Sequence, residues 1–343
     1  MQQHSTSIPD IPDSDAPIPE SDMPTSPEDV SPENVSTSES AVSQSAVPTS
    51  PEGKVLSFQW SWKKQPLAIA YETWGEGRPI LLLPALSSVS SRDEMRGLAE
   101  RLAADYQVVV PDWVGFGESA RPALDYDPKI YHKFLRDFVT AIFQQPVVVI
   151  AAGHGAGYVM QLAQQKPAPW SWVVLVAPTW RGPLPTAMGD RHRPWYNFLR
   201  RLVRTPLLGQ FLYALNVSRP FLGWMYRRHV YADAQHISRS LMRGRAKTAR
   251  QRGARFASAA FVTGALDPIR TRAEFFDYFQ PLPLPTLLVI GEQTPPKSLE
   301  EMEVIAHFSQ VQSYRMPGSL GLHEEYPDEL VAGILPFLKK YLS

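Results

Sequence analysis

The sequence predicts an α/β fold in which a mostly parallel sheet is covered by helices on both faces. Three observations lead to this prediction: short, wholly apolar segments recur along the chain, segments with helical spacing alternate with them, and glycine-rich turns follow some of them. A strand covered on both faces carries a continuous apolar run. Strands that alternate with helices form parallel sheets with right-handed crossovers. A chain of 343 residues can bury a sizeable core of this kind.

The first 53 residues differ in composition from the rest of the chain. They contain ten acidic residues, twelve Ser and nine Pro, and they contain no Lys or Arg. Such a segment cannot bury enough apolar surface to offset its ordering entropy, so we expect residues 1–53 to be disordered. The composition suits either a solubilising tail or an interaction arm, and both remain open.

The body begins with two strands of a hairpin, predicted at Val55–Trp62 and Leu67–Thr73 from their aromatic and branched residues. Ser91 and Glu94 form a capping box that starts a helix. Further helices are predicted around Phe134–Ile142 and at Tyr158–Gln165 and Pro327–Leu342. Buried strands are also predicted at Ile80–Leu83, Gln107–Val110, Pro146–Ala151, Trp172–Val176 and Thr286–Ile290, and Val311–Met316 is predicted to be the last strand.

A basic segment interrupts this alternation. Arg181–Arg255 contains fifteen Arg and one Lys against two Asp, although the whole chain has no net charge. We interpret residues 181–260 as an Arg-rich helical insertion in a body formed by residues 54–180 and 261–343.

The basic charge has several interpretations. It is either the polar outer face of a cap or a surface that docks on anionic lipid. The second is favoured by apolar residues that alternate with arginines, as in interfacial helices: Trp195, Phe198, Leu199 and Leu202 with Arg200, Arg201 and Arg204. The acidic N-terminal segment is a third candidate for contact with it. No nucleic-acid motif accompanies the charge, so we expect no nucleic-acid partner.

Three loops at predicted strand ends resemble those of the α/β-hydrolase superfamily. They are Asp112–Ser119, the turn Gly153-His-Gly-Ala-Gly157, and Gly321–Glu325 before the final helix. The resemblance covers about Val55 to Ser343 and is closest to hydrolase-like proteins of cyanobacteria and plastids. It implies an α/β-hydrolase fold, with a helical cap inserted after the sixth strand. In open sheets of this kind, ligands bind beyond the carboxyl ends of the strands.

The resemblance also locates a catalytic triad, and this chain departs from it. The nucleophile of the family lies between small residues in a strand-to-helix turn, and that position falls on Gly155. Glycine has no side chain that could attack a carbonyl. The general base falls on His323, whose alternative role is a hydrogen bond at the rim of the loop.

The acid and the oxyanion hole are less well defined. Thr294 stands where the family places its acid, so the carboxylate candidates are Glu292 nearby and Asp267, for which a turn cap is the alternative role. The resemblance assigns the oxyanion hole to the backbone N–H groups of Leu86 and Ala156. A relocated nucleophile would come from the serines that follow the predicted strand Ile80–Leu83, although Ser91 is better explained as a helix cap: Ser87, Ser88, Ser90 and Ser91.

These observations leave three functions open. The first is a protein that binds a small apolar or acyl ligand under the cap without serine hydrolysis; the second is a hydrolase of carboxylic esters or lipids with a rearranged site at His323. The third is a scaffold that docks on a membrane or a protein through the basic cap.

Several other classes are not expected. The chain has no cysteine, its eight histidines form no metal-ligand pattern, and the glycine-rich turn at residues 153–157 lacks the spacing of a phosphate loop. We therefore expect no metal and no cofactor. There is no signal-peptide pattern and no apolar run long enough to span a bilayer, so we expect a cytoplasmic protein, with peripheral contact to a membrane as an option.

Overall fold

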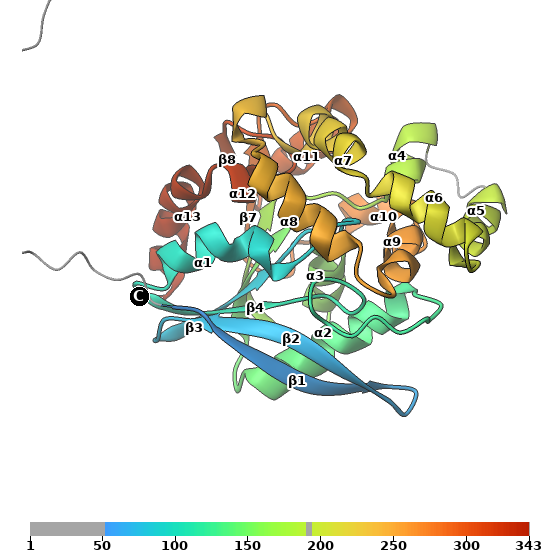
Figure 1. Cartoon of the computed structure of the whole chain (residues 1–343). Coiled ribbons are helices and arrows are strands. Elements are labelled where there is room, and N and C mark those ends of the chain that lie inside the picture. Colours follow the sequence, from blue (N-terminus) through green and yellow to red (C-terminus); the bar gives the residue numbers. More distant parts are fainter. Residues whose placement is uncertain (1–51, 190–193, 343) are drawn as a thin grey trace, which may run out of the picture. The chain divides into compact units, whose positions relative to one another are not determined.

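A computed structural model of the chain describes residues 52–189 and 194–342 (Figure 1). The predicted disorder of the acidic N-terminal segment concerns residues 1–53, of which all but the last two lie outside the described residues. Among the helices of the described ranges, none combines the length and the hydropathy needed to cross a bilayer.

The described residues form one sheet of eight strands in the order β1-β2-β4-β3-β5-β6-β7-β8. Strand β2 pairs antiparallel with β1 and β4, and every other neighbouring pair is parallel. The predicted mostly parallel sheet is therefore confirmed. Its strands are β1 (Lys54–Trp62), β2 (Gln65–Trp74), β3 (Arg78–Leu83), β4 (Tyr106–Pro111), β5 (Val147–Ala152), β6 (Trp170–Val176), β7 (Thr286–Gly291) and β8 (Val311–Met316).

Helices cover both faces of this sheet. In Figure 1, α1 and α13 lie above the strands and α2 lies below them. Every residue of β5 and β7 is buried, as expected for strands between two helical layers. The covering helices are α1 (Arg96–Leu102), α2 (Pro128–Ile142), α3 (Gly155–Ala163), α10 (Arg272–Asp277), α11 (Pro296–Ala306), α12 (Leu322–Glu325) and α13 (Pro327–Leu342).

Local sequence signals account for several helix boundaries. The capping box begins a short 3₁₀ turn, η1 (Arg92–Met95), in which the Ser91 backbone N–H donates to the Glu94 carboxylate at 3.3 Å, and α1 follows directly. The helix predicted from Tyr158 begins earlier, at Gly155, because the end of the glycine-rich turn is already helical.

Between β6 and β7 the regular secondary structure of the described residues is helical. A second apolar cluster lies here, in which Tyr213, Val217, Leu222 and Tyr226 are buried together with Val89 from the loop after β3. The helices of this region are α4 (Pro183–Met188), α5 (Pro194–Arg204), α6 (Leu208–Asn216), α7 (Arg219–Met225), a π-helical turn η2 (Tyr226–Val230), a 3₁₀ turn η3 (Ala234–His236), α8 (Arg239–Ala249) and α9 (Ala254–Val262).

A buried carboxylate joins the loops that follow β3 and β4. Asp112, with no exposed surface, accepts the backbone N–H of Arg92 at 2.6 Å and that of Glu118 at 2.7 Å. It also accepts the Nη1 of Arg92 at 2.5 Å. Gly117 has a φ of +51°, and a Cβ there would lie 2.0 Å from the Asp112 carboxyl carbon. The loop can therefore wrap this carboxylate only with glycine at that position.

We predict that Asp112→Ala lowers the free energy of unfolding by about 3–5 kcal/mol, because it leaves the buried Arg92 without its main partner. Urea unfolding followed by circular dichroism measures this loss. The control is Asp105→Ala, which removes an exposed carboxylate just before β4. Its expected change is less than about 0.5 kcal/mol. Equal effects of the two variants would contradict the prediction.

Candidate functional site

The turn between β5 and α3 lies at the carboxyl edge of the sheet. Gly153 follows the last residue of β5 and has a φ of +50°, and α3 begins two residues later. Its N–H donates to the carbonyl of Val176 at 2.9 Å, and its carbonyl accepts the N–H of Thr179 at 3.1 Å. These two hydrogen bonds fix the turn against the end of β6 and the residues that follow it.

The left-handed residue of this turn is Gly153, whereas the sequence analysis placed the nucleophile position at Gly155. Gly155 is the first residue of α3, and an added Cβ would meet the Trp113 ring at 3.5 Å and the Cβ of Ala151 at 3.9 Å. A Cβ added at Gly153 would instead meet the Cβ of Ala85 at 3.1 Å, in the loop after β3. A side chain at 155 would point at Trp113, and one at 153 would point toward the loop after β3.

The backbone donors at the turn differ from the predicted pair. The Ala156 N–H donates to the carbonyl of Gly153 at 3.2 Å, so it is already occupied. Within residues 52–189 and 194–342, the N–H groups of Leu86 and His154 have no hydrogen-bond acceptor. If the turn has its apex at Gly153, the donor that follows the apex is His154 and not Ala156.

His323 lies in α12, buried, with its Nε2 3.9 Å from the Oε2 of Glu94. Arg245 of α8 pairs with Glu324, the neighbour of His323, and donates to the Ser91 Oγ at 3.2 Å. Burial raises the pKa of Glu94, while His323 and Arg245 act to lower it. His323 thus belongs to a buried charged cluster that connects α12 and α8 to the start of α1.

The structure does not bring Glu292 to His323. Glu292 is exposed. The pKa of Arg315 is raised by its hydrogen bond to Glu303 and, less strongly, by the charge of Glu292, which places Glu292 near Arg315. Thr294 is buried, and its hydroxyl has no hydrogen-bond partner among the described residues.

Asp267 lies beside a histidine that sequence reasoning overlooked. Its Oδ1 is 3.4 Å from the Nε2 of His154 and accepts the N–H of Gly182 at 2.9 Å. Burial raises the pKa of Asp267 to about 7. Burial also lowers the pKa of His154 to about 4, so that its imidazole is neutral near pH 7. The signal in the sequence was a histidine between the glycines of the turn.

Of the serines after β3, Ser87 and Ser91 accept hydrogen bonds through their hydroxyls, whereas the buried Ser90 hydroxyl has no hydrogen-bond partner among the described residues. Ser91 precedes η1 and accepts a hydrogen bond from Arg245, and the Ser87 hydroxyl accepts the N–H of Val89 at 3.2 Å. Ser90 is buried, and the carbonyl of Ser88 accepts from Ser258 of α9 at 3.4 Å. Among the described residues, no contact joins any of these hydroxyls to a histidine.

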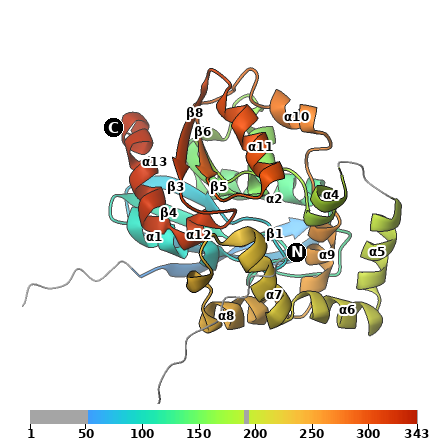
Figure 2. The ribbon, with the colours of Figure 1, turned by 90° about the horizontal axis from the view of Figure 1, so that it is seen from above.

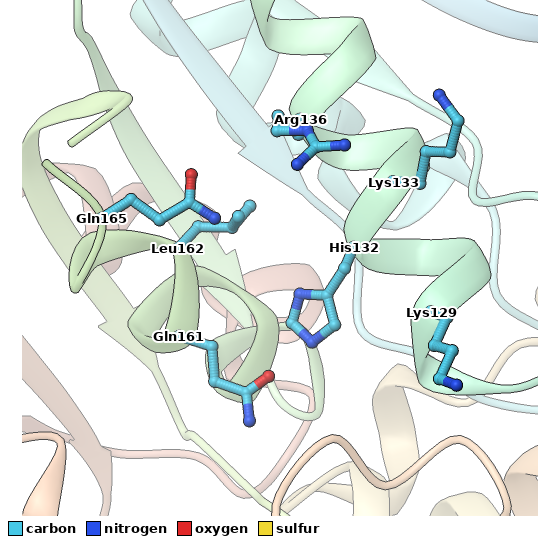
Figure 3. Close-up of a pocket in the computed structure, with 7 residues that line it drawn as sticks. All are labelled: Lys129, His132, Lys133, Arg136, Gln161, Leu162 and Gln165. Carbon is cyan, nitrogen blue, oxygen red and sulfur yellow. The ribbon is translucent and has the colours of Figure 1, made fainter. Parts of the chain in front are cut away.

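A hollow of about 360 Å³ lies between α2 and α3 (Figure 3). None of the residues predicted for the site lines it. Its lining is basic and polar, and the Lys133 ammonium is paired with Asp137 at 2.5 Å. The lining residues are Lys129, His132, Lys133, Arg136, Gln161, Leu162 and Gln165.

Comparison with known proteins gives similarities of three kinds. A family model described as "Alpha/beta hydrolase family" matches residues 80–333. An uncharacterized protein of Mycobacterium tuberculosis (strain ATCC 25618 / H37Rv) is 30% identical over 108 residues, which are 32% of this chain and 31% of that protein. An uncharacterized protein of Mycobacterium bovis matches to the same extent. The chain therefore spans about a third of the length of these relatives.

Among solved structures, a thermophilic esterase from Thermogutta terrifontis is similar, with a TM-score of 0.64 and 19% identity, over 84% of this chain and 100% of that chain. A bromoperoxidase from Bacillus anthracis gives a TM-score of 0.61 and 18% identity, over 83% of this chain and 100% of that chain. At these identities the likeness concerns the fold.

We predict that Asp267→Asn changes how stability depends on pH. Between about pH 4 and 7 the folded wild type holds a proton on Asp267 that the unfolded chain has released, so this group lowers the free energy of unfolding as pH rises. His154 acts in the opposite direction between about pH 4 and 6.5, because burial keeps it neutral. Asn keeps the acceptor for Gly182 but does not titrate.

The free energy of unfolding of Asp267→Asn, relative to wild type, should therefore rise from pH 4 to pH 7, by at most roughly 4 kcal/mol. Urea unfolding at several pH values measures the difference. Asp277→Asn, which removes an exposed carboxylate from α10, is the control. A difference between Asp267→Asn and wild type that stays constant with pH would show that Asp267 titrates normally.

Proposed function

Because the chain belongs to the alpha/beta hydrolase family, we propose that it is a member that binds a small apolar or acyl ligand above the β5–α3 turn without serine hydrolysis. The observation that carries this proposal is that both candidate nucleophile positions are glycine. Gly153 has the left-handed backbone of the turn, and Gly155 faces Trp113. Loss of one triad member typically costs several powers of ten in rate.

The candidates for the general base and the acid of the triad are also not arranged for catalysis at this turn. His323 is engaged beside Glu94 and Arg245, and Glu292 lies near Arg315. Neither ring nitrogen of His323 has a hydrogen-bond partner among the described residues, and the carboxylate beside it, that of Glu94, is 3.9 Å away, so no acid holds the imidazole as a triad would. The geometry therefore favours binding over hydrolysis.

The surroundings of the turn suit a ligand with one polar end and an apolar body. The N–H groups of Leu86 and His154 can donate to a ligand oxygen, as an oxyanion hole would. Helix α9 approaches the same loops: the Phe261 ring lies 5.5 Å from the His154 ring, and Ser258 donates to Ser88. We propose that α9 (Ala254–Val262) covers the ligand from this side.

We predict that the wild type hydrolyses p-nitrophenyl acetate and p-nitrophenyl butyrate no faster than buffer, because no side chain can form an acyl-enzyme at the turn. His323→Ala should match the wild type. Gly155→Ser should also stay inactive, because its hydroxyl would contact Trp113. Release of p-nitrophenol is the measurement. Turnover by the wild type that His323→Ala abolishes would instead establish a rearranged hydrolase.

We predict that octanoate stabilises the protein, because its carboxylate can accept from the free N–H groups while its chain is buried. At a hundred times the dissociation constant, Tm should rise by about 5 °C. Ala85→Leu adds a side chain beside Gly153 and should abolish the rise, whereas Ala68→Leu, at an exposed position of β2, should not. Differential scanning fluorimetry measures both. A rise that survives in Ala85→Leu would place the ligand elsewhere.

A further inference from the structure

Large apolar side chains that remain exposed are concentrated in one stretch of the chain. Ten such side chains occur in the described residues, and only Val55 lies outside residues 188–224. Scattered exposure of single apolar residues is normal, but a cluster indicates a contact surface. The other nine are Met188, Trp195, Phe198, Leu207, Leu208, Phe211, Leu215, Phe221 and Trp224.

Helix α6 presents an apolar stripe on its outer face. Leu208, Phe211 and Leu215 recur at helical spacing and are 51%, 61% and 54% exposed. The inner face of the same helix buries Tyr213, and Val217 is buried just after it. A helix that is apolar on both faces is normally covered on both. The outer face of α6 is therefore built for contact with something outside the described structure.

The neighbouring helices extend this stripe. Helix α6 contacts α5 on one side and α7 on the other, and Figure 2 shows the three helices along one edge of the protein. Trp195 and Phe198 are exposed on α5. Phe221 and Trp224 are exposed on α7, with their rings 5.7 Å apart. We call the exposed apolar residues of α5, α6, α7 and the α5–α6 turn the apolar ridge.

The α5–α6 turn holds a leucine outward. Leu207 is 88% exposed and has a φ of +60°, a left-handed conformation that side chains other than glycine and asparagine rarely adopt. Such backbone strain is found where the surrounding structure holds a residue for a function. Here it keeps a large apolar side chain exposed in the turn that leads into α6.

The ridge is flanked by arginines without acidic partners. Arg201, Arg219, Arg227 and Arg228 are exposed, and none of them forms an ion pair with another described residue. The surrounding sequence, Arg181–Arg255, has sixteen basic residues against two acidic ones. Aromatic and leucine side chains interleaved with arginine are the pattern of helices that lie in the headgroup region of a bilayer.

The positive charge beside the apolar ridge distinguishes between the partners that could cover it. A second copy of the chain would bring the same positive charge to the contact, so repulsion opposes it. Residues 1–53 have the opposite charge, but they contain no aromatic residue and no leucine that could cover the ridge. An anionic bilayer supplies both negative charge and an apolar interior.

We propose that the apolar ridge docks the protein on the surface of an anionic lipid bilayer. The aromatic and leucine side chains enter the boundary between headgroups and acyl chains, and the arginines bind lipid phosphates. Docking of this kind holds the protein on one leaflet and needs no membrane-spanning helix. The inference does not depend on the ligand proposed for the β5–α3 turn.

The test is co-sedimentation of the full chain with vesicles of phosphatidylcholine that contain about a third phosphatidylglycerol. We expect the wild type to bind these vesicles and to bind pure phosphatidylcholine vesicles more weakly. The variant Phe211→Ser/Leu215→Ser should bind about a hundredfold more weakly, because it removes two side chains that insert. Val55→Ser changes an exposed large apolar residue of β1, outside residues 188–224, and should bind like the wild type.

A second pair of variants tests the charge. Arg227→Gln/Arg228→Gln should weaken binding to the anionic vesicles about thirtyfold, and added salt should weaken the wild type in the same direction. Lys63→Gln/Lys64→Gln removes two adjacent charges at the tip of the exposed β1–β2 hairpin and is the matched control. Its binding should be close to that of the wild type.

Results of two kinds would overturn the proposal, from sedimentation and from light scattering. One is that the wild type does not sediment with the anionic vesicles, or that the ridge variant sediments as well as the wild type. The other is that light scattering finds an oligomer that Phe211→Ser/Leu215→Ser converts to monomer, since a second copy would then cover the ridge. Circular dichroism of each variant checks that it is folded before it is compared.

Discussion

The buried carboxylate of Asp112 holds together the loops at the carboxyl edge of the sheet. It binds the backbone and the guanidinium of Arg92 from the loop after β3, and the backbone of Glu118 from the loop after β4. The adjacent Trp113 donates its indole N–H to the carbonyl of Pro84 at 2.8 Å and packs beside Gly155. A charge removed from water is stable only when it is paired in this way, so the two loops are constrained to one arrangement.

This arrangement leaves little space at the β5–α3 turn. A Cβ at Gly153 would lie only 3.1 Å from the Cβ of Ala85, whereas one at Gly155 would be in ordinary contact with Trp113 and Ala151, so the position that requires a small residue is Gly153. The strand-to-helix geometry of a hydrolase can therefore persist without a nucleophile. Fold and chemistry are separable here, because the fold depends on backbone conformation and on the absence of side chains, whereas hydrolysis depends on one side chain being present.

The ionisable groups that resemble a catalytic set are divided between two buried clusters. His323 lies with Glu94, Arg245 and Glu324, and Asp267 lies with His154. In both clusters some buried polar atoms have no hydrogen-bond partner among the described residues, namely both ring nitrogens of His323, the Nε of Arg245 and the Nδ1 of His154. Between β6 and β7 the helices instead leave apolar side chains in solvent, beside arginines that form no ion pair with another described residue, namely Arg201, Arg219, Arg227 and Arg228.

Local pattern was enough to predict the eight strands of the described structure and the helices α1, α2, α3 and α13, because most of these strands are apolar runs and these helices have their own period, but it did not predict α10 or α11. The capping box at Ser91 and Glu94 was predictable for the same reason, since it involves residues only three positions apart. The family was predictable from three loops that stand in the correct order. Each of these signals lies within a short stretch of consecutive residues.

The site depends on contacts between residues that are far apart in the sequence. Only the tertiary structure could decide which of these residues meet. Asp267 meets His154 across more than a hundred residues, and His323 meets Glu94 across more than two hundred, so spacing could not pair them. Which glycine adopts the left-handed conformation depends on where β5 ends and on its bonds to β6. The stripe on α6 has the same helical period as a core face, and only the packing of its neighbours decides that it faces solvent.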